Sequence, residues 1–451
     1  MADLQLQRKL GLFPATNIVI ANMIGAGIFT TSGLLMTGLV NPVLMLGLWV
    51  VGGIIALFGA LSYGELGAAI PKAGGEYKFL SDIYHPVFGF LSGWTSFIVG
   101  FSAPIAASAM GFSEYFSRAV PSLAPWLETH GIMSPAWTNK FLSVSVIVIF
   151  TLIHYRGIRF GAKVQNILTI MKIALILVLL AAGFFSGSGA TTNFSTGGWV
   201  ERGFAGWKSI GLALMWIMFA YSGWNASTYL GSEIIKPERN LPGSLLLGTL
   251  IVLVLYLGLN ALYIYGIHPD EMKGVISIGG LAMGNLFGRP AETLFSLLIG
   301  FALFSSLSAF IIIGPRVYYA MAKDGLFFKS VAKIHPRFLV PSNSILLQCL
   351  LSIIMVISGT FEQVLTYMGF ALGIFPILTV FSVFRLRKIK PGAPRMKGFP
   401  VTQVFYIIAG IMILFLSFLE RPAESSIALA TVLAGIPFYL LFRKQSGSQI
   451  K

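Results

Sequence analysis

The chain has 451 residues, of which 56% are hydrophobic and only 10% carry a charge. Soluble domains carry about 25% charged residues, so this composition excludes an ordinary water-soluble globule and favours a bundle of membrane-spanning helices. In a soluble protein the net charge of +15 would suggest a nucleic-acid partner. Here the basic residues are confined to alternate loops, which indicates that they set the membrane topology. The single cysteine, Cys349, excludes an internal disulfide.

The sequence contains a series of apolar segments, most of them near the roughly 20 residues that a helix needs to cross a bilayer. We predict an all-α membrane protein with 12 transmembrane helices, at 13–37, 43–66, 86–116, 139–157, 162–186, 205–232, 243–267, 290–322, 343–358, 364–385, 401–419 and 425–442. The third and eighth segments are longer than the others, which indicates that they are tilted.

Basic residues predict the orientation. An even number of spans puts both termini on one side of the membrane. On that basis 23 of the 31 Lys and Arg residues lie on the side of the termini, seven lie on the other side, and Lys172 lies within a segment. The side with more positive charge is the cytoplasmic one, so both termini are predicted in the cytoplasm of a multi-pass cell-membrane protein.

The two halves of the predicted bundle mirror each other. We interpret 1–451 as a single transmembrane domain with repeats at 12–186 and 205–386, each holding five spans and each beginning with an interrupted helix. Because five is odd, the second repeat starts on the opposite side of the membrane, which makes the repeat inverted. The last two spans, within 401–442, have no counterpart and are predicted to be peripheral.

Spans one and six are each interrupted by glycine near their middle. The first reads NMIGAGIF at 22–29 and the second reads FAYSGWN at 219–225. Glycine lowers helix stability, and an unpaired backbone group in lipid costs several kcal/mol, so such a break is tolerable only beside an enclosed cavity. Two breaks at matching positions indicate a transporter binding site. The alternative is a face of small residues that packs on a neighbouring helix.

The first break offers main-chain groups to a ligand. The half-helix that ends near Ile24 presents carbonyls, and the half-helix that begins near Gly27 presents unpaired N–H groups. Gly25, Ala26 and Gly27 have almost no side chain, so a ligand can reach the backbone. N–H groups suit a carboxylate and carbonyls suit an ammonium group, which together indicate a zwitterionic α-amino acid.

The second break is interrupted by Ser222 and Gly223. The carbonyls of Phe219, Ala220 and Ser222 are therefore predicted to face the cavity. Phe219 is either an aromatic lid over the ligand or an ordinary core residue. Asn225 sits one turn past the break, where its amide either bridges helices or touches the ligand.

Lys172 lies nine residues beyond Lys163, about 13 Å along the helix axis, and so near the midplane of span five. A lysine at that depth costs about 2.5–3.5 kcal/mol, and such residues are functional by default. Three roles stay open. The ammonium group can replace a bound sodium ion and hold span one to span eight. It can lose its proton on burial and carry a proton. It can also be a structural group bonded to backbone carbonyls.

Several stretches resemble signature motifs of the amino acid–polyamine–organocation (APC) transporters, and within them the L-type amino acid transporter (LAT) branch and its bacterial relatives. They are GAGIF at 25–29, FAYSGWN at 219–225, SE at 232–233, KPERNLP at 236–242, GPRVYYAMAKDG at 314–325, EL at 65–66 and PKAGGEY at 71–77. The resemblance covers nearly the whole chain.

This resemblance implies the LeuT-type 5+5 inverted repeat with spans one and six unwound, and alternating access. The implied substrate contacts are main-chain groups of the two breaks: Gly25, Ala26 and Gly27 for the carboxylate, and Met23, Phe219, Ala220 and Ser222 for the amine. It also implies that Phe219 is the gate and that Lys172 replaces sodium, so that transport is sodium-independent. The branch often has Ser where Ala26 stands and Gly where Ser222 stands.

We therefore expect a sodium-independent transporter that exchanges small or medium neutral L-amino acids in the cell membrane. An acidic substrate is disfavoured because no arginine lies mid-membrane. A dibasic substrate is disfavoured because Lys172 already puts a positive charge near the midplane, and no mid-membrane carboxylate balances that charge. The alternatives are a proton–amino acid symporter with Lys172 as carrier, and a receptor that binds an amino acid without moving it. Motifs of metalloproteases, phosphate-binding loops and nucleophile elbows are absent from the sequence, so neither an enzyme nor a cofactor is expected. The loop 117–138 has no cysteine, so no disulfide-linked ancillary subunit is expected either.

Overall fold

The computed structural model describes residues 8, 10–72, 74–156, 158–185, 188–195, 198, 200, 203–338 and 340–447. These residues are predominantly helical, and their one β-type pairing is an isolated parallel bridge between Leu10 and Ile234. In this bridge the Leu10 N–H donates to the Glu233 carbonyl and the Ile235 N–H donates to the Leu10 carbonyl, both at 2.9 Å. The predicted all-α class is confirmed.

Every predicted apolar segment contains a helix. The helices are α1 (Leu12–Met23) with α2 (Ala26–Leu39), α3 (Pro42–Ala69), α5 (Pro86–Thr95) with α6 (Ser102–Ala119), α8 (Pro135–Tyr155), α9 (Ile158–Phe185), α10 (Phe204–Ala220), α11 (Pro237–Gly266), α14 (Arg289–Lys323), α15 (Ser342–Ser358), α16 (Phe361–Ile389), α17 (Val401–Glu420) and α18 (Pro422–Gly447). Ten spans within the described ranges are long and apolar enough to cross a membrane, and α10 and α15 are shorter apolar helices. The third and eighth spans are the longest, at 34 and 35 residues, as predicted.

Helix starts follow local chemistry. The Asn41 side chain accepts the Leu44 N–H at 2.8 Å, and Pro42 occupies the first position of α3, where no N–H is needed. Thr360 and Gln363 form a capping box at the start of α16. These caps satisfy N–H groups that the first turn of each helix leaves without partners.

Short helices between the spans were not predicted. They are α4 (Gly75–Ile83), α7 (Leu123–Thr129), α12 (Pro269–Met272) and α13 (Ile278–Phe287). In α4, Phe79 and Leu80 are buried while Lys78 and Asp82 pair at the surface at 2.6 Å. Such helices are too short to show a clear periodicity in the sequence.

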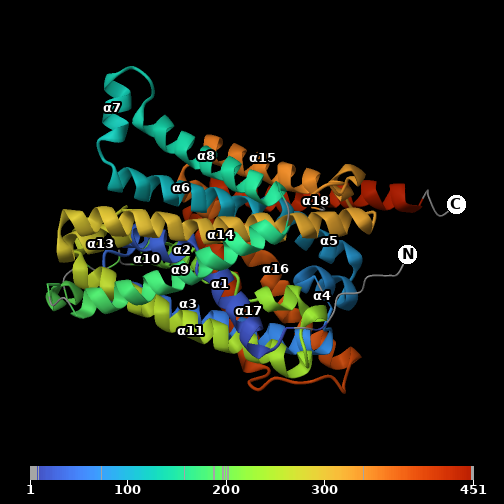
Figure 1. The fold of residues 1–451 in the computed structure, drawn as a ribbon. Coiled ribbons are helices and arrows are strands. Elements are labelled where there is room, and N and C mark those ends of the chain that lie inside the picture. The colour runs from blue at the N-terminus through green and yellow to red at the C-terminus, as the bar shows by residue number, and fades with distance from the viewer. Residues whose placement is uncertain are drawn as a thin grey trace.

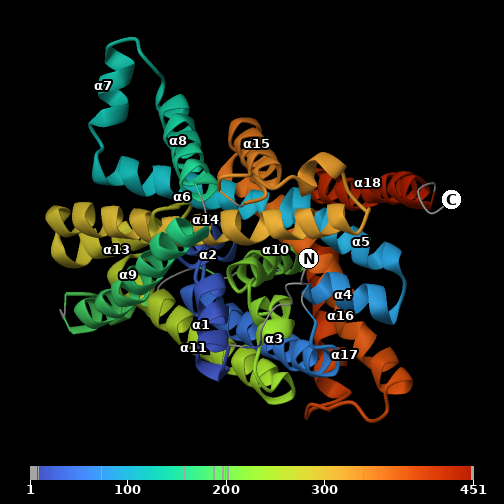
Figure 2. The ribbon, with the colours of Figure 1, turned by 45° about the vertical axis from the view of Figure 1, so that its right-hand side comes forward.

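Helices pair across the bundle in a regular way. α2 packs against α10, α3 against α11 and α6 against α14, so that spans one, two and three meet spans six, seven and eight (Figures 1 and 2). The α6–α14 contact is close, because a Cβ on Gly111 would lie 3.0 Å from Leu303. An inverted repeat of five spans would place equivalent helices together in this way, although the 5+5 repeat itself stays a prediction.

The last two helices differ in their position. α17 packs against α10 and α3, and the Leu416 side chain of α17 covers Gly211 of α10. α18 lies against α5 and α16, and the Trp94 indole N–H donates to the Thr431 carbonyl at 3.0 Å. α17 is thus in contact with one of the interrupted helices, while α18 lies further out.

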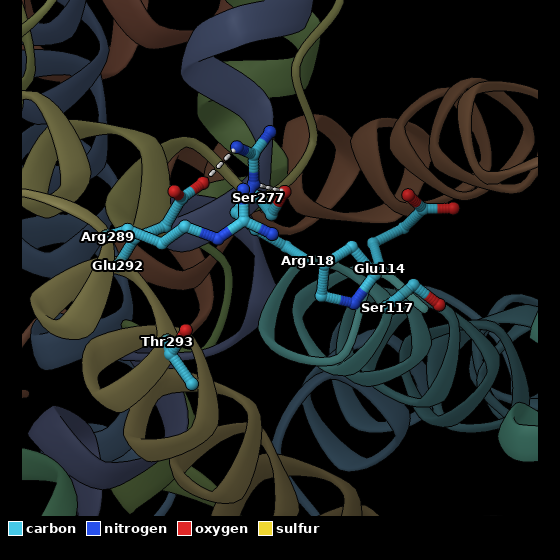
Figure 3. A pocket seen from close by; sticks show the side chains of 8 residues that line it. Glu114, Ser117, Arg118, Ser277, Arg289, Glu292 and Thr293 are labelled. Atoms are coloured by element: carbon cyan, nitrogen blue, oxygen red, sulfur yellow. Dashed lines mark hydrogen bonds and ion pairs between the residues drawn. The ribbon is translucent and has the colours of Figure 1, made fainter. Parts of the chain in front are cut away.

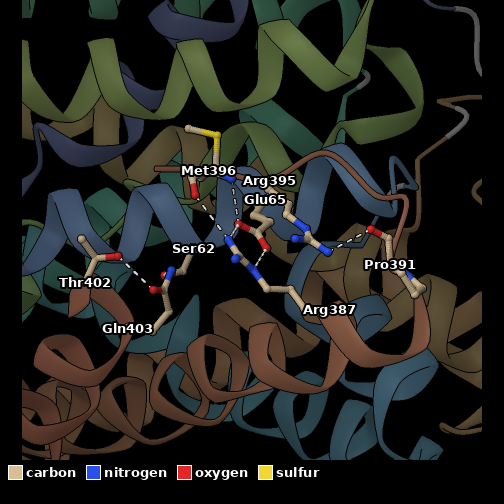
Figure 4. Close-up of polar contacts among 8 residues, drawn as sticks. All are labelled: Ser62, Glu65, Arg387, Pro391, Arg395, Met396, Thr402 and Gln403. Carbon is tan, nitrogen blue, oxygen red and sulfur yellow. Dashed lines mark hydrogen bonds and ion pairs between the residues drawn. The ribbon is translucent and has the colours of Figure 1, made fainter. Parts of the chain in front are cut away.

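The two sides of the bundle can be told apart by their helices (Figure 1). The end of α18 lies beside the start of α5, where Phe442 and Phe90 have ring centroids 6.2 Å apart. We call this end, which also holds α4, the terminal side, and the end with α7 and α13 the far side. On the terminal side, the buried Glu65 carboxylate of α3 accepts hydrogen bonds from Arg387 Nε at 2.6 Å and Nη2 at 2.7 Å (Figure 4).

The far side is held together by α6. Arg118 donates to Ser277 Oγ at 2.5 Å and to Glu292 of α14 at 2.8 Å (Figure 3). One turn earlier, the Tyr115 hydroxyl donates to the Phe29 carbonyl of α2 at 2.5 Å and accepts the Gly279 N–H at 3.0 Å. Arg118, Ser277 and Glu292 line an outward-facing cavity of about 290 Å³. These contacts join α2, α13 and α14 to α6 on the far side of both breaks.

Candidate functional site between the two interrupted helices

The first interruption is where the sequence predicts it. α1 ends at Met23 and α2 begins at Ala26, while Ile24 and Gly25 between them are extended. The first N–H groups of α2 therefore have no carbonyl partner within their own helix, and the last carbonyls of α1 have no N–H partner within theirs. Opposite partial charges consequently face each other across two residues.

The second interruption is longer. α10 ends at Ala220, residues 221–225 form turns with Gly223 at φ +97°, and a 3-10 turn follows at Ala226–Tyr229. The apolar segment predicted at 205–232 is therefore α-helical only in its first half. The Thr228 hydroxyl bonds locally to the Asn225 carbonyl at 2.7 Å, which favours a turn over a continued helix, and the Ser227 hydroxyl pairs with Ser244 of α11 at 2.9 Å.

The two interruptions lie directly against each other. A Cβ on Gly27 would lie 2.5 Å from Ala220 Cα, and a Cβ on Gly223 would lie 2.8 Å from the Asn22 carbonyl carbon. Gly27 and Gly223 thus permit contact between backbones, which a side chain would prevent. Such backbone contact is also expected for a face of small residues that packs on a neighbouring helix. Gly27 and Gly223 therefore allow the helices to pack closely and also leave main-chain groups uncovered by side chains.

Solvent reaches this region. Gly25, Ser222 and Gly223 are each partly exposed, although Met23, Ile24, Ala26 and Gly27 around them are buried. The predicted gate, Phe219, is buried beside the break, with 8% of its surface exposed. The main-chain groups predicted to meet substrate are thus brought together, and part of them is open to solvent.

Tyr256 of α11 was not predicted. Its hydroxyl lies 2.6 Å from the Met23 carbonyl and 3.0 Å from the Ala220 carbonyl, and so bridges the two interruptions. The Phe219 carbonyl accepts the Ser222 N–H at 2.8 Å. Three of the four carbonyls predicted for the amine are therefore already engaged, although a carbonyl oxygen has a second lone pair. A tyrosine within an apolar span was the only sequence signal.

Lys172 of α9 is buried, with 1% of its surface exposed. Its ammonium group donates to the carbonyls of Ala21, at 3.2 Å, and Ile24, and lies 3.5 Å from Ser306 Oγ of α14. Ser306 itself donates to the Ile24 carbonyl at 3.2 Å. Lys172 therefore contacts α1 and lies near α14, which fits both the sodium-replacing role and the structural role, and its ammonium group is at the carbonyl end of α1, where the helix dipole favours a positive charge.

Asn225 is also engaged, because its Nδ2 donates to the Glu76 carboxylate of α4 at 3.0 Å. Tyr63 donates to the same oxygen at 2.6 Å and Ser92 lies 3.4 Å from the other oxygen. Burial raises the pKa of Glu76, and the three hydrogen bonds act against that rise. The bridging role considered for Asn225 is therefore seen here, while its contact with substrate stays a prediction. Glu76 was missed as a site residue because the sequence placed it in a loop.

Two interrupted helices packed together inside a multi-pass helical bundle are typical of a membrane transporter. The comparisons identify the family, since a family model described as amino acid permease matches residues 10–437. The chain therefore belongs to the amino acid permease family, within the APC superfamily.

Named relatives cover nearly all of the chain. The b(0,+)-type amino acid transporter 1 of Mus musculus is 28% identical over 446 residues, which are 97% of this chain and 88% of the mouse protein. The large neutral amino acids transporter small subunit 2 of Mus musculus is 28% identical over 97% of this chain and 81% of its own. The Asc-type amino acid transporter 1 of Mus musculus is 26% identical with the same two shares. All three are named as amino acid transporters.

Proposed function

We propose that this protein exchanges small or medium neutral L-amino acids across a cell membrane by alternating access, without sodium. The observation that carries the proposal is the contact of Lys172 with the carbonyls of Ala21 and Ile24. The Lys172 amino group occupies the carbonyl end of the interrupted α1, where a coupling cation would otherwise be needed. A relative named as a large neutral amino acids transporter supports the neutral class.

The substrate carboxylate is proposed to bind at the start of α2. The amides of Gly25, Ala26 and Gly27 lie at the N-terminal end of α2, where the helix dipole favours a negative charge. The partial exposure of Gly25 supports access to these groups. Ala26 offers no hydroxyl, so recognition of the carboxylate would rest on the main chain.

The substrate amine is proposed to bind carbonyls of both interruptions. The Ser222 carbonyl belongs to a partly exposed residue of the second break, and the Met23, Phe219 and Ala220 carbonyls keep a second lone pair each. Phe219 would close over the bound molecule as a gate. In this proposal the terminal side faces the cytoplasm and the two repeats move against each other around the site.

Glu76 bears on whether the substrate is a neutral or a cationic amino acid. The expectation of a neutral substrate rested partly on the lack of a carboxylate near the midplane to answer a cationic side chain. The structure brings the Glu76 carboxylate to Asn225, within one turn of the second break. All the same, its two oxygens already face Tyr63, Ser92 and Asn225, so a neutral substrate stays our proposal.

Counterflow in proteoliposomes tests exchange. Vesicles that hold purified protein are loaded with unlabelled L-alanine, L-serine or L-leucine, or left empty, and uptake of the labelled amino acid is measured without sodium. We expect uptake that needs internal amino acid and that does not respond to an imposed proton gradient. Uptake into empty vesicles driven by that gradient would instead establish proton symport.

A competition panel tests the substrate class. Unlabelled glycine, alanine, serine, leucine, glutamate and arginine are added outside loaded vesicles. We expect the neutral amino acids to inhibit and glutamate and arginine to have little effect. Strong inhibition by arginine would contradict the neutral class and would direct attention to Glu76.

A further inference from the structure

The segment that follows the second break is fastened to the loop between α3 and α4. The Gly74 N–H donates to the Tyr229 carbonyl at 3.2 Å. A Cβ on Gly75, which has φ +51°, would lie 2.8 Å from the Tyr229 ring, and a Cβ on Gly231 would lie 2.7 Å from the Lys72 carbonyl. We call these contacts between 72–76 and 225–231 the loop clasp. Glycine is needed in it because backbones and a ring meet without room for side chains.

The Glu76 carboxylate is the polar centre of the loop clasp. One of its oxygens accepts hydrogen bonds from Tyr63 of α3, at 2.6 Å, and from Asn225, at 3.0 Å. The other lies 3.4 Å from Ser92 of α5. Only 8% of Glu76 is exposed, and no ion pair in the described part of the chain includes it. A buried carboxylate with neutral donors binds them more strongly than a neutral acceptor would.

This arrangement decides how the Asn225 side chain is turned. Its Nδ2 faces the carboxylate, and an amide rotated by 180° would place its oxygen against that carboxylate, which repels it. The Thr228 hydroxyl and the Thr228 N–H both bind the Asn225 carbonyl, at 2.7 and 3.0 Å, and so fix the main chain at the same residue. Asn225 therefore has a defined side-chain orientation two residues beyond Gly223, which touches α1.

We propose that Glu76 is a positioning residue for substrate binding, because it holds the Asn225 amide with its oxygen available to the ammonium group of the amino acid. The proposal rests on the proposed function, and it adds a carboxylate outside the two interruptions to the site. Glu76 acts through Asn225 and does not contact the substrate itself. Loss of either residue then removes the same interaction.

A double-mutant cycle read in binding tests this proposal. Binding of radiolabelled L-alanine, L-serine and L-leucine, each tested singly, is measured on folded, detergent-solubilised full-length protein. We expect Glu76→Ala and Asn225→Ala each to weaken the affinity by about tenfold or more, as the loss of a charge-assisted hydrogen bond does. The double variant is expected to bind no more weakly than Asn225→Ala, because the two residues act in series. A double variant weaker by the product of the two single effects would overturn the proposal.

Two further variants separate positioning from general support of the fold. Tyr63→Phe removes the other strong hydrogen bond to the same Glu76 oxygen and leaves Asn225 in place, so its affinity is expected to stay within about twofold of wild type. Glu76→Gln keeps an acceptor oxygen, and a loss smaller than that of Glu76→Ala is expected. If Glu76→Ala does not fold, the cycle is run with Glu76→Gln and Asn225→Ala. A loss in Tyr63→Phe equal to that of the Glu76 variant would show that Glu76 only supports the scaffold.

The binding readout also keeps this proposal apart from the proposed function. A wild-type protein that binds amino acid but shows no counterflow would refute exchange, and the cycle could still be completed. A wild-type protein that binds none of the three amino acids would refute both.

Discussion

Gly27 of α2 and Ala220 of α10 are in backbone contact, so close that a Cβ on Gly27 would lie 2.5 Å from Ala220 Cα. One residue belongs to the amide end of a half-helix and the other to the carbonyl end of another. The helix end proposed for the substrate carboxylate and one of the helix ends proposed for its amine are therefore in direct contact.

Gly27→Ala is expected to abolish exchange. The added methyl group has to displace Ala220 backbone, and overpacking of this kind costs about 1–3 kcal/mol and shifts the groups around it. The measurement is counterflow in proteoliposomes, with Gly47→Ala as the matched control because a Cβ on Gly47 of α3 meets nothing within 4 Å. Normal exchange by Gly27→Ala would contradict a site built on this contact.

Tyr256→Phe is expected to lower the affinity for amino acid or the exchange rate by about tenfold. It removes the hydroxyl that bridges the Met23 and Ala220 carbonyls, and a buried acceptor left without a partner costs about 1–3 kcal/mol. Binding and counterflow are both measured.

The control for this prediction is Tyr263→Phe, two turns further along α11. The Tyr263 hydroxyl is buried and has no hydrogen-bond partner in the described part of the chain, so its loss is expected to change little. Equal effects of the two variants would show that the bridge between the interruptions has no special role.

Lys172→Ala is expected to reduce turnover at least tenfold while the protein still inserts and purifies. The positive charge at the end of α1 is lost, and with it the link to Ser306 of α14. Exchange is measured at saturating amino acid, together with the melting temperature. A lowered melting temperature with normal turnover would favour the purely structural role.

A surface lysine with a similar bond provides the matched control. Lys140 also donates to a backbone carbonyl, that of Ile357 at 2.6 Å, but in an exposed position. Lys140→Ala is therefore expected to keep wild-type exchange. A comparable loss in both variants would mean that any lysine–carbonyl bond matters equally.

Glu65→Ala is expected to destabilise the protein by about 3–5 kcal/mol, because the Arg387 guanidinium of α16 is left largely buried without its carboxylate. The Met396 N–H, which donates to Glu65 at 2.8 Å, also loses its acceptor. Thermal unfolding in detergent measures the effect. Asp270→Ala breaks a pair with Lys273 at the exposed surface, where ion pairs contribute little, and should leave the melting temperature unchanged. Equal shifts in both variants would contradict this prediction.

The interruptions could be predicted from the sequence because glycine weakens a helix at the depth where a broken helix is most costly. Gly25 and Gly223 mark the breaks, and the structure confirms both. Lys172 was equally conspicuous, since a charge in the middle of an apolar segment is costly. These signals are local, and a single stretch of sequence carries each of them.

The partners of these residues could not be predicted in the same way. Tyr256 bridges two interruptions that lie 233 and 36 residues away from it in sequence, and only the folded bundle brings the three together. Glu76 comes 149 residues before Asn225. The turns after Asn225 were missed because the Thr228 hydroxyl bonds locally to the Asn225 carbonyl, which hydropathy does not reveal.

The bridge between Leu10 and Ile234 attaches the start of α1 on the terminal side through hydrogen bonds that can break and re-form. Its two main-chain hydrogen bonds join Leu10, just before α1, to residues 233–235, which directly follow the loop clasp in the sequence. Together such bonds contribute roughly 1–3 kcal/mol, so ordinary thermal motion undoes them many times each second. In the proposed alternating-access cycle, α1 can therefore separate from residue 234 and pair with it again without an external energy source.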